Sequence, residues 1–294
     1  MSEPLVKGRP PAKAETTAQM LALEELVVAR EHQDGKMLAV NDARLLSTKR
    51  NSQLATPGSD EALVAKAELE SVVADCDRAV AECAKTLALR RQLDEAQTIR
   101  WVLANAAHGR ARALGSEGSK RRLMLIGRQY YWQTPKAVPF GELPPYVTQV
   151  LAHYGLQDFN GILVNVYEHR ESKIGAHCDA TQDLASGPVK TLSLAIRPED
   201  RRPIFEGGQP PTLSRLEFRG PDNHGPHGSA YMELYHGKVC EFDAFAHAAV
   251  RRTHEVRETL RPRVSLTCRQ FKRSAEELAV EAEAAGEKRK REGE

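Results

Sequence analysis

The side chains best suited to chemistry lie between residues 165 and 269 of the 294-residue chain. His177, Asp179 and His254 offer two imidazoles and one carboxylate, which is the ligand set of non-haem Fe(II) oxygenases. Such a site keeps coordination positions open for a co-substrate and O2. Arg263 and Arg269 add two guanidinium groups, which bind carboxylates in a bidentate manner. Together these residue types predict an iron site that uses an acidic co-substrate.

A His-x-Asp pair alone is weak evidence, because so short a motif recurs by chance. The chain contains a second example, His32-Gln-Asp34, in a stretch whose composition predicts a helix. Side chains two residues apart do not face each other on a helix, whereas on a strand they point to the same side. His177 and Asp179 can therefore converge on one ion if their segment is extended.

Two segments with strand-like alternation flank this pair. In residues 161–167 a period of two places Asn165 and Tyr167 on one face. In residues 263–269 one face is apolar, and the opposite face carries Arg263, Ser265, Thr267 and Arg269. Four polar side chains in an otherwise apolar strand are costly to bury unless they line a site or water. We interpret them as the wall of a polar pocket; the alternative is a surface strand with a solvated charged face.

Four short motifs follow one another along this half of the chain: Asn165-Val-Tyr167, His177-Cys-Asp179, His254-Glu-Val256 and Arg263-Val-Ser265-Leu-Thr267-Cys-Arg269. In this order they resemble the AlkB-like family of Fe(II)/2-oxoglutarate dioxygenases. The resemblance covers about residues 120–271 and includes softer similarities at residues 143–154 and 191–196. It implies an α+β chain whose catalytic core is a double-stranded β-helix, a jelly roll of two sheets that encloses the metal.

The resemblance also implies roles for the metal ligands and cofactors. His177, Asp179 and His254 are the implied ligands of Fe(II), with 2-oxoglutarate and O2 as the other reactants. The second histidine has an alternative, because His254 lies only nine residues before Arg263, a short spacing for the family, and His247 lies sixteen residues before it. The apolar residue two places after His254 favours His254.

The remaining roles concern 2-oxoglutarate. Arg263 is implied to bind its distal carboxylate, and Arg269 to lie near the metal and the other end of the co-substrate. Asn165 and Tyr167 are implied to hydrogen-bond it from the neighbouring strand. Ser265 takes a place more often held by Asn, and its hydroxyl can still donate.

The implied activity is oxidation of a C–H bond with release of succinate and CO2. When the carbon is an N-methyl group, formaldehyde is lost as well, so the family's commonest outcome is oxidative demethylation of N-alkylated nucleobases in DNA or RNA. Two alternatives stay open. One is a 2-oxoglutarate-dependent hydroxylase or demethylase of a protein or small molecule, and the other is a non-catalytic interaction protein.

A substrate surface for nucleic acid is suggested by the aromatic cluster Tyr130, Tyr131 and Trp132, since flipped bases are held between aromatic side chains. Arg128 and the preceding basic residues suit phosphates. A core role for the aromatic residues is the alternative. Against nucleic acid, the net charge is only +2, and Ala180 and Thr181 stand where some DNA-repair members have acidic residues.

The chain is expected to have four parts: a disordered N-terminus over residues 1–15, a helical hairpin extension over 16–118, the dioxygenase domain over 119–272, and a charged helical tail over 273–294. The hairpin helices are expected over about 16–46 and 60–113. The second helix contains an apolar heptad repeat formed by Leu69, Val73, Cys76, Val80, Cys83 and Leu87. This seam predicts packing on the catalytic core or self-association through the N-terminal helices.

No apolar run is long enough for a signal peptide or a membrane span, so no membrane association is expected. Five cysteines without framework spacing fit a reducing compartment. The sequence therefore predicts an intracellular protein, nuclear or cytoplasmic. A basic run at residues 288–291 is compatible with a nuclear signal.

Overall fold

The computed structural model describes residues 17–54, 59–108, 121–130, 137–201, 210–220 and 230–272. The disordered N-terminus expected over 1–15 and the helical tail expected over 273–294 lie outside the described residues, as do Tyr131 and Trp132. The chain divides into two compact units, Glu15–Gln97 and a unit that contains Thr98–Glu294. This boundary falls before the one expected at residue 118, because Ile99 and Val102 are buried in the core of the second unit.

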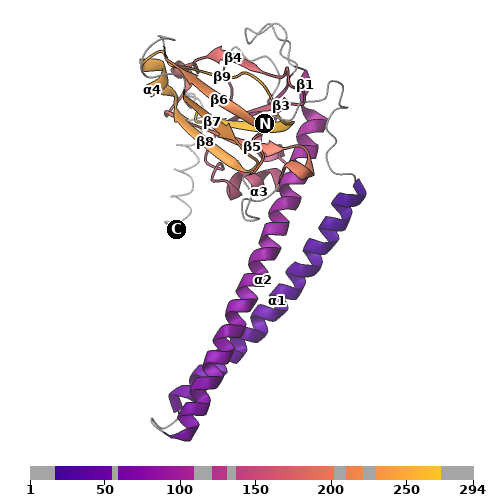
Figure 1. The fold of residues 1–294 in the computed structure, drawn as a ribbon, viewed down its shortest axis with the longest axis vertical. Helices are drawn as coiled ribbons and strands as arrows, with labels where there is room; N and C mark the ends of the chain where they lie inside the picture. Colours follow the sequence, from indigo (N-terminus) through magenta and orange to yellow (C-terminus); the bar gives the residue numbers. More distant parts are fainter. Residues whose placement is uncertain are drawn as a thin grey trace, which may run out of the picture. The chain divides into compact units, whose positions relative to one another are not determined.

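The first unit is an antiparallel pair formed by α1 (Thr17–Leu54) and the part of α2 (Asp60–Asn105) up to Gln97 (Figure 1). Arg90 binds Glu31 through two hydrogen bonds of 2.8 and 2.6 Å, and Arg44 contacts Asp75 at 3.2 Å. A small apolar cluster contains Met20, Val27, Leu93 and Ala96. The hairpin expected from the sequence is thus present, with a first helix that runs to Leu54 rather than to residue 46.

The buried stripe of α2 agrees with the expected heptad seam only in part. Val73, Val80 and Leu87 of that seam are exposed, whereas the buried side chains, also seven residues apart, are Val72, Ala79, Thr86 and Leu93. Two apolar stripes lie next to each other on this helix, and heptad spacing alone does not tell which one faces the partner helix. Leu69, Cys76 and Cys83 of the expected seam are half-buried, whereas Val73, Val80 and Leu87 form an exposed stripe. The expected seam is therefore wrong by one residue at these last three positions.

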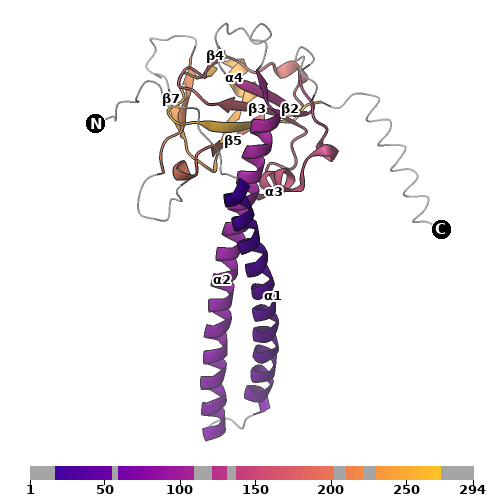
Figure 2. The same ribbon diagram turned by 90° about the vertical axis from the view of Figure 1, so that its right-hand side faces the viewer.

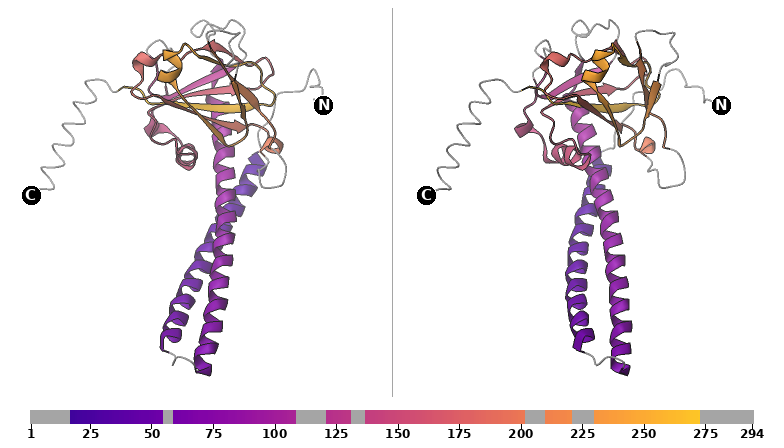
Figure 3. Two further views of the ribbon diagram at one scale, coloured as in Figure 1. Left: turned by 60° about the vertical axis from the view of Figure 1, so that its left-hand side comes forward. Right: turned by 90° about the vertical axis from the view of Figure 1, so that its left-hand side faces the viewer.

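The second unit contains two antiparallel sheets, which form two layers (Figures 2 and 3). The larger has the strand order β1-β2-β3-β10-β5-β8 and the smaller β4-β9-β6-β7. Their bounds are Ala107–His108 (β1), Arg122–Gly127 (β2), Gly161–Tyr167 (β3), Ile174–His177 (β4), Pro188–Ala195 (β5), Ser214–Arg219 (β6), Ala230–Leu234 (β7), Lys238–Asp243 (β8), Thr253–Val256 (β9) and Arg263–Arg269 (β10). The expected mixture of helix and antiparallel sheet is confirmed.

Short helices complete this unit. The helix α3 (Pro145–His153) begins at a proline, whose fixed φ suits the first helical position. The helix α4 (Ala244–Ala249) is capped by Asp243, which accepts a hydrogen bond from the Ala246 amide at 2.9 Å. The described residues also contain three 3-10 helices: η2 (Phe140–Glu142), η3 (Thr181–Asp183) and η4 (Pro198–Asp200). None of the helices in the described ranges has the length and apolarity needed to cross a membrane.

The two faces of the larger sheet differ in the way that the alternation predicts. The apolar residues of β10 are fully buried in a core cluster with Val147 and Val150 of α3 and with Ile99 and Val102. These β10 residues are Val264, Leu266 and Cys268. The opposite face of the sheet points toward the smaller sheet and carries the polar residues of β3 and β10. Packing of the apolar face in this core thus fixes the polar side chains on the opposite face of the sheet.

Candidate active site

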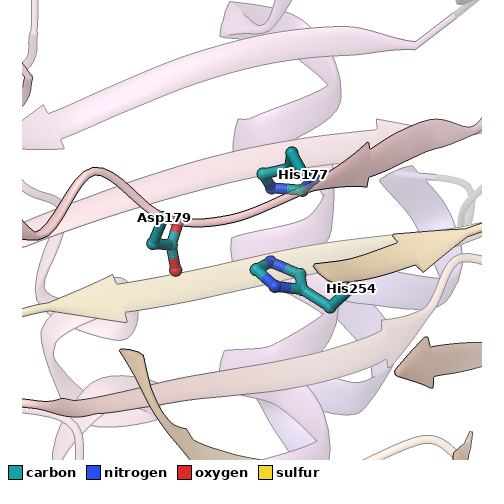
Figure 4. Close-up of side chains that lie close together, drawn as sticks. All are labelled: His177, Asp179 and His254. Atoms are coloured by element: carbon teal, nitrogen blue, oxygen red, sulfur yellow. The ribbon is translucent and has the colours of Figure 1, made fainter. Parts of the chain in front are cut away.

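His177, Asp179 and His254 lie together in the second unit (Figure 4). Their potential ligand atoms are all within 4.8 Å of one another. His177 ends β4 and is the cross-strand partner of His254 on β9, so the ladder between the two strands brings the imidazoles together. Their ring centroids are 4.2 Å apart. Asp179 lies on the coil that follows β4, and its side chain is only 3% exposed.

Two of the three ligand candidates are oriented by a neighbour. His177 Nδ1 lies 2.8 Å from the Gly175 carbonyl oxygen, so Nδ1 donates and Nε2 keeps its lone pair. Arg269 Nη2 donates to Asp179 Oδ1 at 2.6 Å, whereas Oδ2 of the same carboxylate is buried without a partner. His254 Nδ1 is also buried without a partner. These unpartnered atoms fit a group that the three side chains would hold between them.

The protonation states suit a metal. Burial lowers the pKa of His177 and, together with the charge of His177, lowers the pKa of His254 to about 3. Burial would raise the pKa of Asp179, but Arg269 and the histidines bring it below its ordinary value. At neutral pH the site therefore offers two neutral imidazoles and one carboxylate. Metal binding needs its ligands in these deprotonated forms.

His247, the alternative second histidine, is not part of this group. It belongs to α4, and its ring stacks on Phe242 with a centroid distance of 5.1 Å and an interplanar angle of 10°. It also makes an edge contact with Phe218 at 5.1 Å. The structure brings His254, not His247, to His177 and Asp179.

A cavity continues from the histidines along β10 and β3. Its polar lining comes from both ends of β10 and from neighbouring strands: Asn165, Tyr167, Thr191, His177, His254, Arg263, Ser265, Thr267 and Arg269. Its apolar lining includes Leu216, Leu234 and Phe242. All five residues predicted to bind the co-substrate therefore line one cavity, together with two of the three predicted metal ligands.

The register of the larger sheet explains this arrangement. Arg263 is the cross-strand partner of Tyr167, and Ser265 is the partner of Asn165 on β3 and of Ser193 on β5. Because facing residues of neighbouring strands project to the same side, three strands contribute to one polar wall. The expected pocket wall is confirmed, and the surface-strand alternative is wrong, since Arg263, Ser265 and Arg269 are each at most 5% exposed.

Arg263 is the most unusual of these residues, because it is 1% exposed and has no carboxylate partner in the described part of the chain. Its Nη1 donates to Ser193 Oγ at 3.4 Å, and the guanidinium lies 4.2 Å from the centroid of the Tyr167 ring. Its Nε has no partner. Burial lowers the pKa of Arg263, an effect that Tyr167 opposes. A buried guanidinium without a carboxylate partner fits an anionic ligand.

Two of the residues expected to bind substrate are described. Tyr130 is 3% exposed, with its ring 5.0 Å from the Phe271 ring and 5.6 Å from the Arg269 guanidinium, both measured to centroids. It therefore has no open face on which a base could stack, and the core role is the one that its position fits. Arg128 donates from Nη1 to the Lys272 carbonyl oxygen. Tyr131 and Trp132 lie outside the described residues.

The sequence did not single out Ser193 or Gly175, although both support the site. Ser193 contacts Arg263, and the Gly175 carbonyl orients His177. Alternation in β5 was the available signal for Ser193, because Thr191 and Ser193 share a face. Nothing in the sequence indicates the carbonyl of Gly175, since that contact depends on the local path of β4.

The chain matches no family model and no curated protein. Two solved structures are similar in part. A prolyl-4-hydroxylase from Pseudomonas putida is 16% identical, with 63% of this chain and 86% of that chain covered and a TM-score of 0.38. A prolyl hydroxylase from Trichoplax adhaerens, in complex with a hypoxia inducible factor peptide, is 12% identical, with coverages of 62% and 78% and a TM-score of 0.37. With sequence identities and TM-scores this low, neither likeness assigns a function to this chain.

Proposed function

We propose that this chain is an Fe(II)- and 2-oxoglutarate-dependent dioxygenase. The observation that carries the proposal is a His-Asp-His group whose two histidines line the same cavity as Arg263, a buried arginine that has no carboxylate partner among the described residues. Two imidazoles and one carboxylate leave coordination positions open at an Fe(II) ion. The strand order supports a double-stranded β-helix, because β3 to β10 divide into two four-stranded groups, β3-β10-β5-β8 and β4-β9-β6-β7.

Each residue has a defined task in this proposal. His177, Asp179 and His254 would hold the metal, and Arg269 would keep Asp179 ionised and oriented through its 2.6 Å contact. When bound, Fe(II) and 2-oxoglutarate supply the oxidation of a substrate C–H bond by O2, with release of succinate and CO2. Arg263, with Ser193, would bind the distal carboxylate. Asn165, Tyr167 and Ser265 would contact the rest of the co-substrate.

The space between these groups is narrow. The cavity measures about 40 Å³, which corresponds to roughly three water-sized volumes. The imidazoles of His177 and His254 lie close together across it. Binding of a five-carbon diacid would therefore require the side chains near Arg263 to adjust.

For the substrate, the AlkB-like motif order supports oxidative demethylation of an N-alkylated nucleobase in DNA or RNA, with formaldehyde as a further product. The second candidate is a 2-oxoglutarate-dependent hydroxylase or demethylase of a protein or small molecule. The burial of Tyr130 favours this second candidate, because it removes one of the three aromatic side chains expected to stack on a base.

Succinate formation tests the proposal. Protein loaded anaerobically with Fe(II) would be exposed to O2 and 2-oxoglutarate, with and without N-methylated DNA and RNA oligonucleotides. We expect succinate from the wild type and none from Asp179→Ala. Stimulation by one class of oligonucleotide would support demethylation, whereas basal succinate without stimulation would support the second candidate. Equal succinate from both proteins, or none from the wild type, would contradict the oxygenase.

A further inference from the structure

Arg121 is a second buried arginine that the proposed chemistry does not use. It directly precedes β2 and is 4% exposed. Its Nη1 is buried without a hydrogen-bond partner, and the described residues offer it no ion pair. Its neighbour Arg122 is fully engaged: it donates to Glu168 at 3.0 and 2.9 Å and to the Leu103 carbonyl at 2.6 Å. Two adjacent arginines therefore differ in that one has its acid and the other lacks one.

The pleat of β2 places Arg121 on the side of the site. Leu123 is the cross-strand partner of Asn165, and Arg122 is the partner of Val166 in the apolar core. Because successive side chains alternate, Arg121 shares the face of Leu123 and Asn165. Arg121 does not line the cavity of Arg263, so it lies beside that cavity, one strand further along the sheet.

The burial of Arg121 has the same energetic cost as that of Arg263. A buried guanidinium without a counter-charge is costly unless a ligand supplies one. Two carboxylates near the site are paired with other arginines, since Glu168 binds Arg122 and Asp179 binds Arg269. The distal carboxylate of the co-substrate would be bound by Arg263. Among the described residues no carboxylate pairs with Arg121, and a bound molecule would supply the missing anion.

We propose that Arg121 binds an anionic group, a phosphate or a carboxylate, of the primary substrate. The assignment of this anion to a substrate rests on the proposed oxygenase function, whereas anion binding by Arg121 does not. The site would then select acids or phosphoesters, held beside the co-substrate with the carbon to be oxidised directed toward the metal. Arg121 would be a specificity-determining residue, and Arg122 a structural one.

Anion binding can be measured without metal or turnover. The background would be Arg263→Met, so that Arg263 cannot bind the probe. Its melting temperature would be recorded with sodium phosphate, with sodium acetate and with sodium chloride at matched ionic strength. At about ten times the dissociation constant we expect phosphate or acetate to raise the midpoint by roughly 3–5 °C over chloride. The stronger of the two would identify the substrate as a phosphoester or a carboxylic acid.

The matched control is the double variant Arg263→Met/Arg121→Met, in which the rise should vanish. Arg121→Met removes an unpartnered buried charge, so the protein should remain folded. In the same background, Arg121→Lys keeps a positive charge and should keep part of the rise. An equal rise with and without Arg121, or no rise with either anion in Arg263→Met, would overturn the proposal.

A second readout separates this proposal from the proposed function. In the protein loaded with Fe(II), Arg121→Met alone should leave the affinity for 2-oxoglutarate unchanged, because the proposal places Arg121 on the substrate and not on the co-substrate. A tenfold or larger loss of 2-oxoglutarate affinity would assign Arg121 to the co-substrate and overturn the proposal. If the wild type formed no succinate, the oxygenase function would fail, while the phosphate and acetate measurements would still decide whether Arg121 binds an anion.

Discussion

Arg263 and Arg269 lie at the two ends of β10 and line the same cavity, yet only one of them has a carboxylate partner. Arg269 donates to Asp179 at 2.6 Å, and both side chains are buried. Arg263 has the hydroxyl of Ser193 and the ring of Tyr167, with no acid in the described part of the chain. The same residue type on one strand thus occurs in two electrostatic states.

Arg269 belongs to an internal ion pair, whereas Arg263 has the properties of a ligand site. Removing one partner of a buried pair leaves an uncompensated charge, whereas replacing a charge that never had a partner removes a cost. Arg269 should therefore contribute to the stability of the ligand-free protein, and Arg263 should not. Arg263 should contribute only when an acid is bound. We expect three effects on stability, which decrease from Arg269 to pH to Arg263, and a separate effect of Arg263 on co-substrate binding.

The largest effect on stability is expected for Arg269→Met. The substitution leaves Asp179 buried without its partner, so we expect the free energy of unfolding of the metal-free protein to fall by about 3–5 kcal/mol. Chemical denaturation in the presence of a chelator would measure it. The double variant Arg269→Met/Asp179→Asn should recover a large part of the loss, because it removes the stranded charge. A loss below about 1 kcal/mol would show that the pair is not a stabilising contact.

An intermediate effect on stability is expected from the protonation of His254, which lies beside Asp179. The pKa of His254 is about 3 in the folded protein, against 6.5 as its ordinary value. Between these values the unfolded chain binds a proton that the folded chain does not, so stability should fall as the pH is lowered below 6.5. We expect a loss of about 2 kcal/mol from pH 7 to pH 5 in the metal-free protein.

The control for the pH effect is His254→Gln, which cannot take up that proton. Denaturation of this variant at pH 7 and pH 5 should show a smaller loss than the wild type. A remaining loss is expected, since burial also lowers the pKa of His177. The same pH dependence in both proteins would mean that His254 does not titrate in this range.

The smallest effect on stability is expected for Arg263→Met without ligand. Because the guanidinium has no carboxylate partner, its replacement by an apolar side chain of similar length should be neutral, or should stabilise by about 1 kcal/mol. The same denaturation measurement would give the value. A destabilisation similar to that of Arg269→Met would indicate that Arg263 has a structural partner, and the contrast between the ends of β10 would then be lost.

Much of this site follows from local patterns. The period of two in residues 263–269 separates Val264 and Leu266 from Arg263 and Ser265, and the structure has the same two faces. Alternation is reliable here because one face packs against a core, so a slip by one residue would bury the charges in it. The composition also predicted two helices, over about 16–46 and 60–113, and the structure has helices over Thr17–Leu54 and Asp60–Asn105.

Other features depend on pairing between distant segments. The register His177 to His254 decides which histidine meets Asp179, and spacing along the chain left His247 open. The buried stripe of α2 depends on α1, because Val72 and Val73 are equally apolar and only one of them faces that helix. The isolation of Arg121 beside the well-paired Arg122 also has no sequence signal, since it results from where Glu168 lies.

The central claim is that Arg263 binds the distal carboxylate of 2-oxoglutarate at a metal held by His177, Asp179 and His254. The most direct test is calorimetric titration of the anaerobic Fe(II)-loaded protein with 2-oxoglutarate and with 2-oxopentanoate, which has a methyl group in place of that carboxylate. We predict that the wild type binds 2-oxoglutarate at least about a hundredfold more tightly, in the range of a lost buried charge contact. Arg263→Met should bind both weakly and with similar affinity. If Arg263→Met kept the preference for 2-oxoglutarate, the account would be contradicted.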